Sequence, residues 1–126
     1  MKLVETPRAP IPAGHYSQAV VYGGFVFVSG QLPHDVSHPG RPAGDAEEQT
    51  ERALRNVEAI LEAVGSSLDR LLSVTVYVSD IALWPRVNAA YARVLGAHRP
   101  ARAVVPVKEL HHGYLVEVQA VAALGE

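Results

Sequence analysis

The sequence contains no cysteine, only one tryptophan and two phenylalanines, and no long apolar run. The absence of cysteine excludes disulfide bonds, thiolate catalysis and zinc sites built on cysteine. No apolar run reaches the roughly 18 residues that a membrane-spanning helix needs. The first 14 residues also lack an apolar core of signal-peptide length. We therefore expect a cytoplasmic protein that has no membrane segment.

A strong excess of either charge is missing as well. The chain carries 11 Lys and Arg against 13 Asp and Glu, for a net charge of −2. This balance argues against a broad phosphate-binding surface, so we do not expect nucleic acid as a partner, although a local basic patch stays possible. The 126 residues, of which 48% are hydrophobic, are typical of one globular domain. We predict a single domain over residues 1–126, with residues 1–14, which hold three prolines, as an extended arm.

The apolar pattern predicts seven elements in the order β-β-α-β-α-β-β. Two short strands flank Gly23-Gly24, a typical hairpin turn because glycine tolerates positive φ. A helix begins at Asp45, with Glu48 placed for a capping box, and a second helix begins near Asp80. The predicted strands cover residues 16–22, 25–29, 71–79, 102–107 and 115–122, and the helices end before Gly65 and Gly96. This order indicates an α+β fold, with one mixed sheet and both helices packed on one of its faces.

The other face of that sheet needs a cover. The last predicted strand, residues 115–122, is apolar on both sides, whereas two amphipathic helices can cover only one side. A second copy of the chain is the simplest cover, so we predict a homo-oligomer with the sheets inside. The alternative is that the N-terminal arm and the long loop at 31–44 cover this face.

Two charges interrupt the terminal strands, and each needs a physical reason. Arg102 opens one strand, and Glu117 lies inside the other. Because a buried charge is rarely unpaired, each should have a counter-charge, a ligand or an ordered water beside it. If the two strands pair as a hairpin, with Val104 opposite Glu117, then Arg102 and Glu117 are diagonal neighbours on one face, roughly 7 Å apart at the backbone. This register is an assumption, and the alternative is that another strand lies between the two.

This pair has two interpretations that the residues alone leave open. A buried Arg–Glu pair can be a structural salt bridge, with little net effect on stability. Alternatively, Arg102 holds a substrate carboxylate, which its planar guanidinium matches in a bidentate way, and Glu117 handles a water molecule. The second interpretation requires both side chains to reach one cavity.

Other candidate residues give weaker signals. No histidine pair has metal-binding spacing, because His34 and His38 lie in the long loop and His111 and His112 in the last connection, so we expect no metal site. Ser29 lies at a strand end without the glycines of a nucleophile elbow, which argues against a serine hydrolase.

Several motifs together resemble the Rid family of reactive intermediate deaminases, also called YjgF-like proteins. They are GHYSQAV at 14–20, FVFVSGQLP at 25–33, VTVYVSD at 74–80, VNAAYARVLG at 87–96, HRPARAVV at 98–105 and LVEVQAVA at 115–122. The resemblance implies a chorismate-mutase-like fold and a homotrimer with clefts between neighbouring subunits. It also implies hydrolysis of enamines and imines, such as 2-aminoacrylate and its imine tautomer, to 2-keto acids and ammonia.

The resemblance assigns roles to individual residues. Arg102 matches the carboxylate-binding arginine of the family, and Glu117 matches its water-directing glutamate. Tyr16 matches the tyrosine of the family's GPYSQA motif, Asn88 the asparagine of its second helix, and Gly30 and Val104 the positions whose backbones line the cleft. Together with Ser29, which lies at a strand end, these residues are predicted to bind the substrate. The resemblance implies neither a metal nor an organic cofactor, and the partner would be a small imino or keto acid. His15, Ala103 and Gln119 depart from the usual pattern, which leaves the substrate open.

Two other functions remain as alternatives. The same cleft could bind a small carboxylate in a regulatory role without turnover. RNA cleavage is a third function attributed to the family, and the acidic net charge makes it the weakest of the three.

Overall fold

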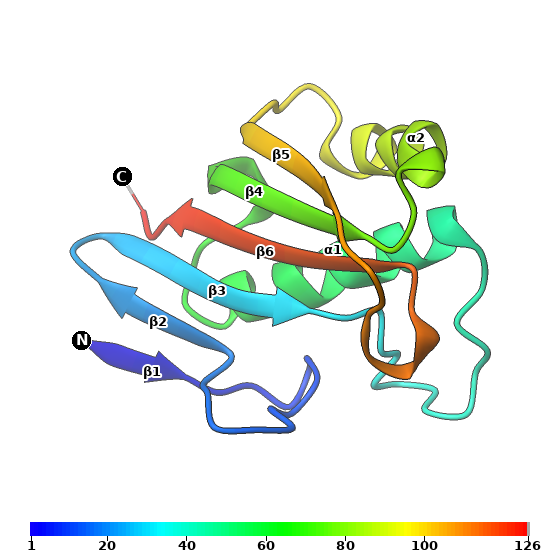
Figure 1. Ribbon diagram of the computed structural model, residues 1–126. Helices are drawn as coiled ribbons and strands as arrows, with labels where there is room; N and C mark the ends of the chain where they lie inside the picture. The colour runs from blue at the N-terminus through cyan, green and yellow to red at the C-terminus, as the bar shows by residue number, and fades with distance from the viewer. Residues whose placement is uncertain (126) are drawn as a thin grey trace.

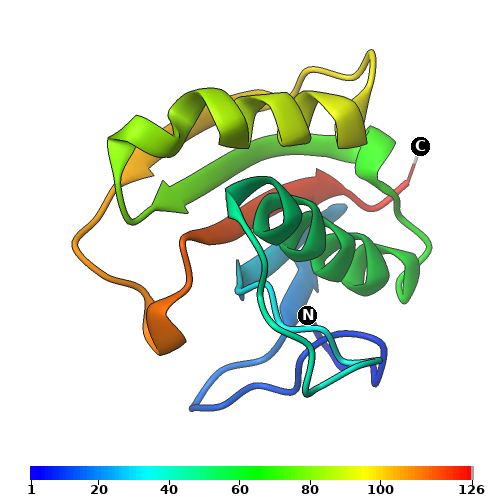
Figure 2. The same cartoon turned by 90° about the vertical axis from the view of Figure 1, so that its right-hand side faces the viewer.

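The computed structural model describes residues 1–125, and the last residue of the predicted domain, Glu126, lies outside the described residues. Two helices pack on one face of a six-stranded mixed sheet (Figures 1 and 2). The strands are β1 (Lys2–Val4), β2 (Ala19–Tyr22), β3 (Phe25–Gln31), β4 (Leu71–Val78), β5 (Ala101–Pro106) and β6 (Val116–Ala123), in the spatial order β1-β2-β3-β6-β4-β5. The helices are α1 (Ala46–Glu62) and α2 (Trp84–Leu95), and single 3-10 turns lie at Leu68–Arg70, Ile81–Leu83 and His111–Gly113.

This architecture confirms the predicted α+β fold, with one strand added. The predicted arm contains β1, which pairs antiparallel with β2, and Val4 of this strand is buried. A strand of three residues is too short to give a recognisable alternation of apolar residues. No helix among residues 1–125 is both long and apolar enough to cross a lipid bilayer.

The predicted hairpin between the last two strands is wrong. Strand β4 lies between β5 and β6, so that Arg102 is opposite Val74 and Glu117 is opposite Tyr77. Strands β4 and β5 are parallel and are joined through α2. Parallel neighbours need a crossover of this length, and a helix that packs on the sheet brings the chain back beside the strand it left.

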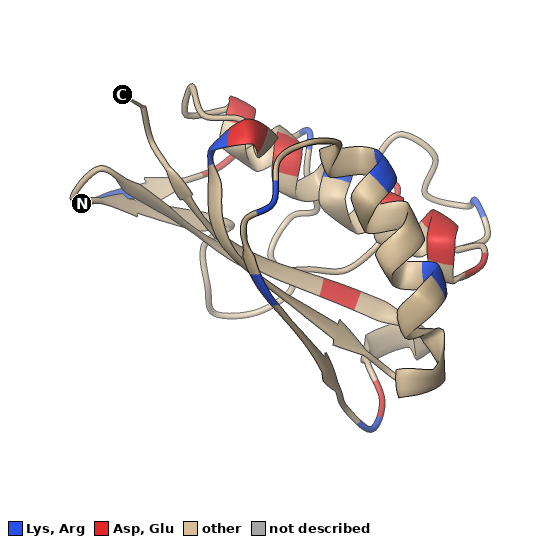
Figure 3. Cartoon of the chain, turned by 90° about the horizontal axis from the view of Figure 1, so that it is seen from above, with Lys and Arg blue, Asp and Glu red and all other residues tan. Residues whose placement is uncertain are grey.

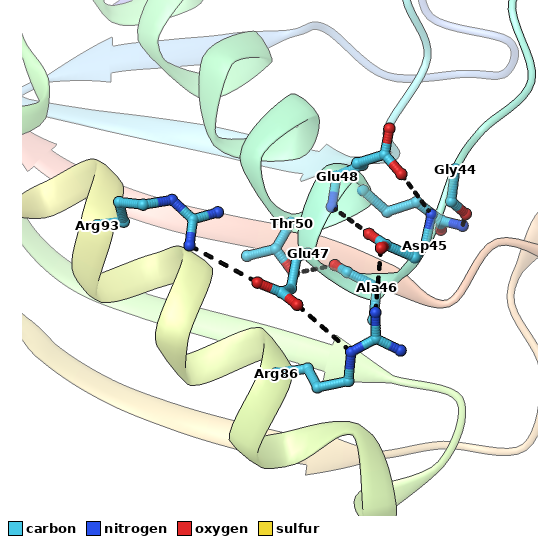
Figure 4. Close-up of polar contacts among 9 residues, drawn as sticks. Gly44, Asp45, Ala46, Glu47, Glu48, Thr50, Arg86 and Arg93 are labelled. Atoms are coloured by element: carbon cyan, nitrogen blue, oxygen red, sulfur yellow. Dashed lines mark hydrogen bonds and ion pairs between the residues drawn. The ribbon is translucent and has the colours of Figure 1, made fainter.

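The predicted turn and the start of the first helix are confirmed, whereas Asp80 caps the 3-10 turn Ile81–Leu83 and the second helix starts four residues later, at Trp84. Gly23 and Gly24 have φ angles of 61° and 84°, which place the β2–β3 hairpin on a turn that favours glycine at both positions. The Asp45 side chain accepts from the Glu48 N–H, and the Glu48 side chain accepts from the Asp45 N–H (Figure 4). Figure 4 also shows the ion pairs that join the two helices, in which Arg86 of α2 contacts Asp45 and Glu47.

Replacement of Asp45 by alanine should lower the melting temperature by a few degrees. The change removes the helix cap and the 3.0 Å contact with Arg86 Nη2. The hydrogen bond that the Asp45 carboxylate accepts from the Glu48 N–H lowers the pKa of Asp45 below its ordinary 3.8, and the positive charge of Arg86 acts in the same direction. The stabilisation by the charge is therefore present above the unfolded pKa and is lost as the pH falls through the lowered folded pKa. Asp45→Asn keeps a capping side chain without a charge. Its melting temperature should be lower than that of the native protein at neutral pH, and this difference should disappear at acidic pH.

The two faces of the sheet differ in what covers them. On the central strands the apolar residues that face the helices are buried, among them Val74, Val76 and Val78 of β4. The opposite face carries exposed aromatic residues, with Tyr22 66% and Phe27 46% exposed. Figure 3 shows that charged residues gather on the helices and loops, while the strands are mostly uncharged. We call the uncovered side the open face.

Candidate functional site

Two unpaired charges mark the interior of the sheet. Within residues 1–125, Arg102 and Glu117 are the only charged residues of strands β2 to β6. Both side chains are half-buried, and neither forms an ion pair with any residue that the structure describes. The structural salt bridge between them is therefore absent from the described chain. Half-buried charges without a counter-charge are suited to a charged or polar ligand.

Arg102 is held by three side chains of α2. Its Nη1 donates to Asn88 Oδ1 at 2.9 Å, and its Cζ lies 4.7 Å from the ring centroid of Tyr91 and 5.7 Å from that of Trp84. These contacts are a neutral hydrogen bond and two cation–π interactions, so they orient the guanidinium without neutralising it. We call Arg102, Asn88, Trp84 and Tyr91 the arginine half-site.

The arginine half-site adjoins a cavity of ≈ 490 Å³, which Asn88, Tyr91 and Arg102 help to line. Tyr91 is only 7% exposed, and its hydroxyl has no hydrogen-bond partner among the described residues. Burial raises the pKa of the Tyr91 phenol, and the positive charge of Arg102 opposes this shift. Val104, the next β5 residue on the side of Arg102, packs at the edge of the core. The arrangement can bind a small carboxylate beside an apolar wall.

Glu117 lies on the open face directly over Gly30. A Cβ atom added at Gly30 would overlap Glu117 Oε2 and lie 3.1 Å from Cδ. The sheet is irregular here, because Val28 is opposite Ala120 while Gln31 is opposite Val118, which leaves one extra residue in β3. Such a bulge re-aims the backbone of its strand. The glycine therefore gives the Glu117 carboxylate the space it occupies.

Tyr16 and Gly30 line one wall of a second cavity, of ≈ 250 Å³. The Tyr16 hydroxyl accepts from the Ala13 N–H at 3.3 Å, and the Tyr16 side chain is 51% exposed. Ser29 is committed to the backbone, because its hydroxyl donates to the Ser17 carbonyl at 2.6 Å. Its role is therefore to fix the segment that carries Tyr16. We call Tyr16, Ser29, Gly30 and Glu117 the glutamate half-site.

Replacement of Gly30 by alanine should displace the Glu117 carboxylate. The added methyl group would occupy the position of Oε2, so a reaction that depends on this carboxylate should slow about tenfold, since a small misplacement of a catalytic group is costly. The comparison is Gly40→Ala, where an added Cβ has no neighbour within 4 Å. Initial rates of the two variants should differ by this factor, and equal rates would show that the position of Glu117 is unimportant.

Within one chain, the two half-sites do not meet. Arg102 lies on the helix side of β5, and Glu117 lies on the open face of β6 with β4 between them. The residues of β4 opposite Arg102 and Glu117, Val74 and Tyr77, are three positions apart, and β5 and β6 are two strand spacings apart. The Cα atoms of Arg102 and Glu117 are therefore separated by roughly 14 Å. The predicted diagonal neighbours on one face are thus wrong, and a three-carbon acid cannot touch both side chains of one chain.

A larger cavity, of ≈ 870 Å³, lies elsewhere, between the arm, the long loop and the start of α1. Its principal charges already satisfy one another, because Asp35 contacts Arg41 at 3.3 Å and Arg52 at 3.4 Å. None of the predicted site residues lines it. Across residues 1–125, no group of three or more histidine and acidic side chains is arranged to hold a metal ion.

Sequence reasoning missed Trp84 and Tyr91 as contacts of Arg102. Their spacing with Asn88, at i, i+4 and i+7, places all three on one side of a helix. That signal was present in the sequence, but it does not show what this side of the helix contacts.

Comparisons with known proteins agree with this fold. The family model described as endoribonuclease L-PSP matches residues 6–124. A RutC family protein of Pyrococcus abyssi is 40% identical over 121 residues, which cover 96% of this chain and 95% of that protein. A crystal structure from Thermotoga maritima is 46% identical, with a TM-score of 0.91 and coverage of 98% of this chain and 97% of that chain. The structure of Escherichia coli TdcF with bound serine is 33% identical, with a TM-score of 0.91 and 98% coverage of both chains.

Proposed function

Because the chain belongs to the endoribonuclease L-PSP family, which includes the RutC proteins and the YjgF-like Rid proteins, we propose that it hydrolyses reactive imines. The substrates are 2-imino acids and their enamine tautomers, of the 2-iminopropanoate and 2-aminoacrylate type, and the products are 2-keto acids and ammonia. The observation that carries this proposal is the pair of half-buried, unpaired charges, Arg102 and Glu117, in otherwise uncharged strands.

The proposed site lies between two subunits of a homotrimer. Arg102 and Glu117 of one chain are on opposite sides of the sheet, so a single substrate needs Arg102 from one subunit and Glu117 from its neighbour. Two features of the chain favour such contacts. The edge strand β5 has one side unpaired, and the open face exposes aromatic residues that a neighbour would cover. Arg102 lies on that edge strand.

The proposed reaction begins with the protonated imine. The Arg102 guanidinium binds the substrate carboxylate through paired hydrogen bonds, while Asn88 and Tyr91 hold its orientation. The Glu117 carboxylate accepts a proton from a water molecule, whose oxygen bonds to the imine carbon as the C=N π electrons move to nitrogen. The proton then passes from Glu117 to the nitrogen of the tetrahedral adduct. Ammonia leaves as the carbonyl forms, and the carboxylate of Glu117 accepts the remaining hydroxyl proton.

The chemistry of a relative supports this class of substrate. TdcF was crystallised with serine, a small molecule with a carboxylate and a nitrogen on the same carbon. A 2-imino acid has these two groups in the same relation. Imines also hydrolyse in water without a catalyst, so positioning by Arg102 and Glu117 is sufficient for a modest acceleration. The proposed role is the removal of reactive electrophiles in the cytoplasm.

A coupled assay tests the proposal. An amino-acid oxidase generates imino acids in situ, and semicarbazide traps the imine that remains. Addition of the protein should reduce the trapped imine and speed the release of ammonia and keto acid. No acceleration over a panel of amino acids, together with tight carboxylate binding in calorimetry, would instead favour a binding or regulatory protein.

RNA cleavage is the second candidate function, because the matching family model carries the description endoribonuclease. The net charge of −2 provides few contacts for a phosphate backbone. Nuclease activity that persists after repurification, needs no metal and falls with added salt would favour this function over imine hydrolysis.

A further inference from the structure

Three histidines surround the cavity of the glutamate half-site. The ≈ 250 Å³ cavity that Tyr16 and Gly30 line is also lined by His34, His111 and His112. The loop before α1 supplies His34, and the connection between β5 and β6 supplies the other two. Residues far apart in the sequence thus bring three imidazoles to one cavity, which we call the histidine pocket.

The imidazole rings form one packed cluster. The His34 and His112 centroids are 5.4 Å apart, and those of His111 and His112 are 6.2 Å apart. Tyr114 packs edge-on against His34, and its hydroxyl lies 3.0 Å from His34 Nδ1. When His34 is neutral with its proton on Nε2, the Tyr114 hydroxyl donates to Nδ1 and leaves Nε2–H as a donor. His112 has a φ of 61°, a backbone conformation that non-glycine residues seldom adopt.

The polar groups around this pocket suit an anion. No carboxylate is among the described residues that line it. Glu117 lies beyond Gly30, and Asp35, next to His34 in sequence, is engaged by Arg41 and Arg52. Burial, and the positive charge that His112 can carry, lower the pKa of His34. An anion among the imidazoles would accept charge-assisted hydrogen bonds from their N–H groups and would favour the protonated form of His34.

We propose that the histidine pocket receives the substrate side chain and selects imino acids that carry a second carboxylate. The inference rests on the proposed function, because it places the reacting carbon beside Glu117. Gly30 contacts Glu117 and also lines the pocket, so the pocket begins where the reacting carbon would be. Its volume equals that of roughly eight water molecules, which accommodates a short acidic side chain with its hydration.

The test compares two keto acids of equal length. One is 2-oxoglutarate, and the other is 2-oxopentanoate, which has a methyl group in place of the distal carboxylate. Binding is followed by calorimetry and by the fluorescence of Trp84, the single tryptophan, which lies 5.7 Å from Arg102 Cζ. The native protein should bind 2-oxoglutarate about tenfold more tightly at neutral pH, the gain expected from one charge-assisted hydrogen bond.

Variants then assign this preference to the imidazoles. His34→Phe keeps a ring against Tyr114. His112→Gly removes one ring of the cluster but suits the positive φ, so it preserves the backbone conformation. The double variant should bind the two acids with a ratio near one, and each single variant should fall between. The matched control is His38→Phe, in the same loop but outside the pocket, which should keep the tenfold ratio.

The outcomes separate this inference from the proposed function. If the native protein binds both acids through Arg102 with equal affinity, or if the double variant keeps the preference, the histidine pocket does not select a carboxylate and the proposed function stands. If neither acid shows binding that Arg102→Ala removes, the carboxylate site itself is refuted, and the selectivity inference with it.

Discussion

Replacement of Arg102 by alanine should reduce kcat/KM for imine hydrolysis about a hundredfold. The variant removes the only charge of the arginine half-site, and loss of one partner of a partly desolvated ion pair costs about 2–5 kcal/mol. The substrate carboxylate would then face Trp84 and Tyr91 without a counter-charge. The coupled oxidase assay measures the change. The rate of imine hydrolysis without protein is the baseline, and the rate with the variant should fall toward it.

Arg102→Lys is the informative companion to this variant. It keeps the charge but loses the planar fork that donates to Asn88 and stacks on Tyr91, so partial activity with a raised KM is expected. Both variants should stay folded, with a melting temperature lowered by a few degrees at most, because the contacts at stake are one neutral hydrogen bond and two cation–π contacts. Native rates in a folded Arg102→Ala protein would remove the arginine from the mechanism.

Two inactive variants should restore activity when their subunits are mixed. Arg102→Ala keeps an intact glutamate half-site, and Glu117→Gln keeps an intact arginine half-site. If each site uses one half-site from each of two neighbours, random assembly at equal amounts makes about a quarter of the sites complete. Either variant alone should lose about a hundredfold or more, because each lacks the clamp or the general base. The specific activity of the mixed oligomer is the measurement.

The mixing experiment needs proof that subunits exchange. Co-expression with two different tags and tandem purification yields oligomers that contain both chains. A mixture of Glu117→Gln with the double variant Arg102→Ala/Glu117→Gln has no intact glutamate and should stay inactive. If the first mixture also stays inactive in proven mixed oligomers, the site does not lie between subunits, and the roughly 14 Å separation within one chain becomes an argument against any joint role.

The elements themselves were predictable because their signals are local. The Gly23-Gly24 turn follows from positive φ angles that glycine tolerates, and the start of α1 follows from hydrogen bonds between Asp45 and its neighbour Glu48. The neighbours of each strand were not predictable in this way. The alternation of apolar and polar residues along a strand shows which of its faces is covered, but it does not show which strand lies beside it. The same alternation therefore fits both a β5–β6 hairpin and the observed order, in which β4 lies between these strands.

The sequence by itself singled out the two charges of the candidate site, because a charge in an apolar strand is costly enough to be recognised wherever the strand lies. Arg102 and Glu117 could be named in this way, whereas Gly30 was named through the resemblance to the Rid family. Only the tertiary structure decided that Arg102 faces α2 while Glu117 covers Gly30 on the open face. The physical reason is that strand order and register bring together residues distant in sequence, and no local pattern encodes those distances. The same reason explains why three scattered histidines became one pocket only in the folded chain.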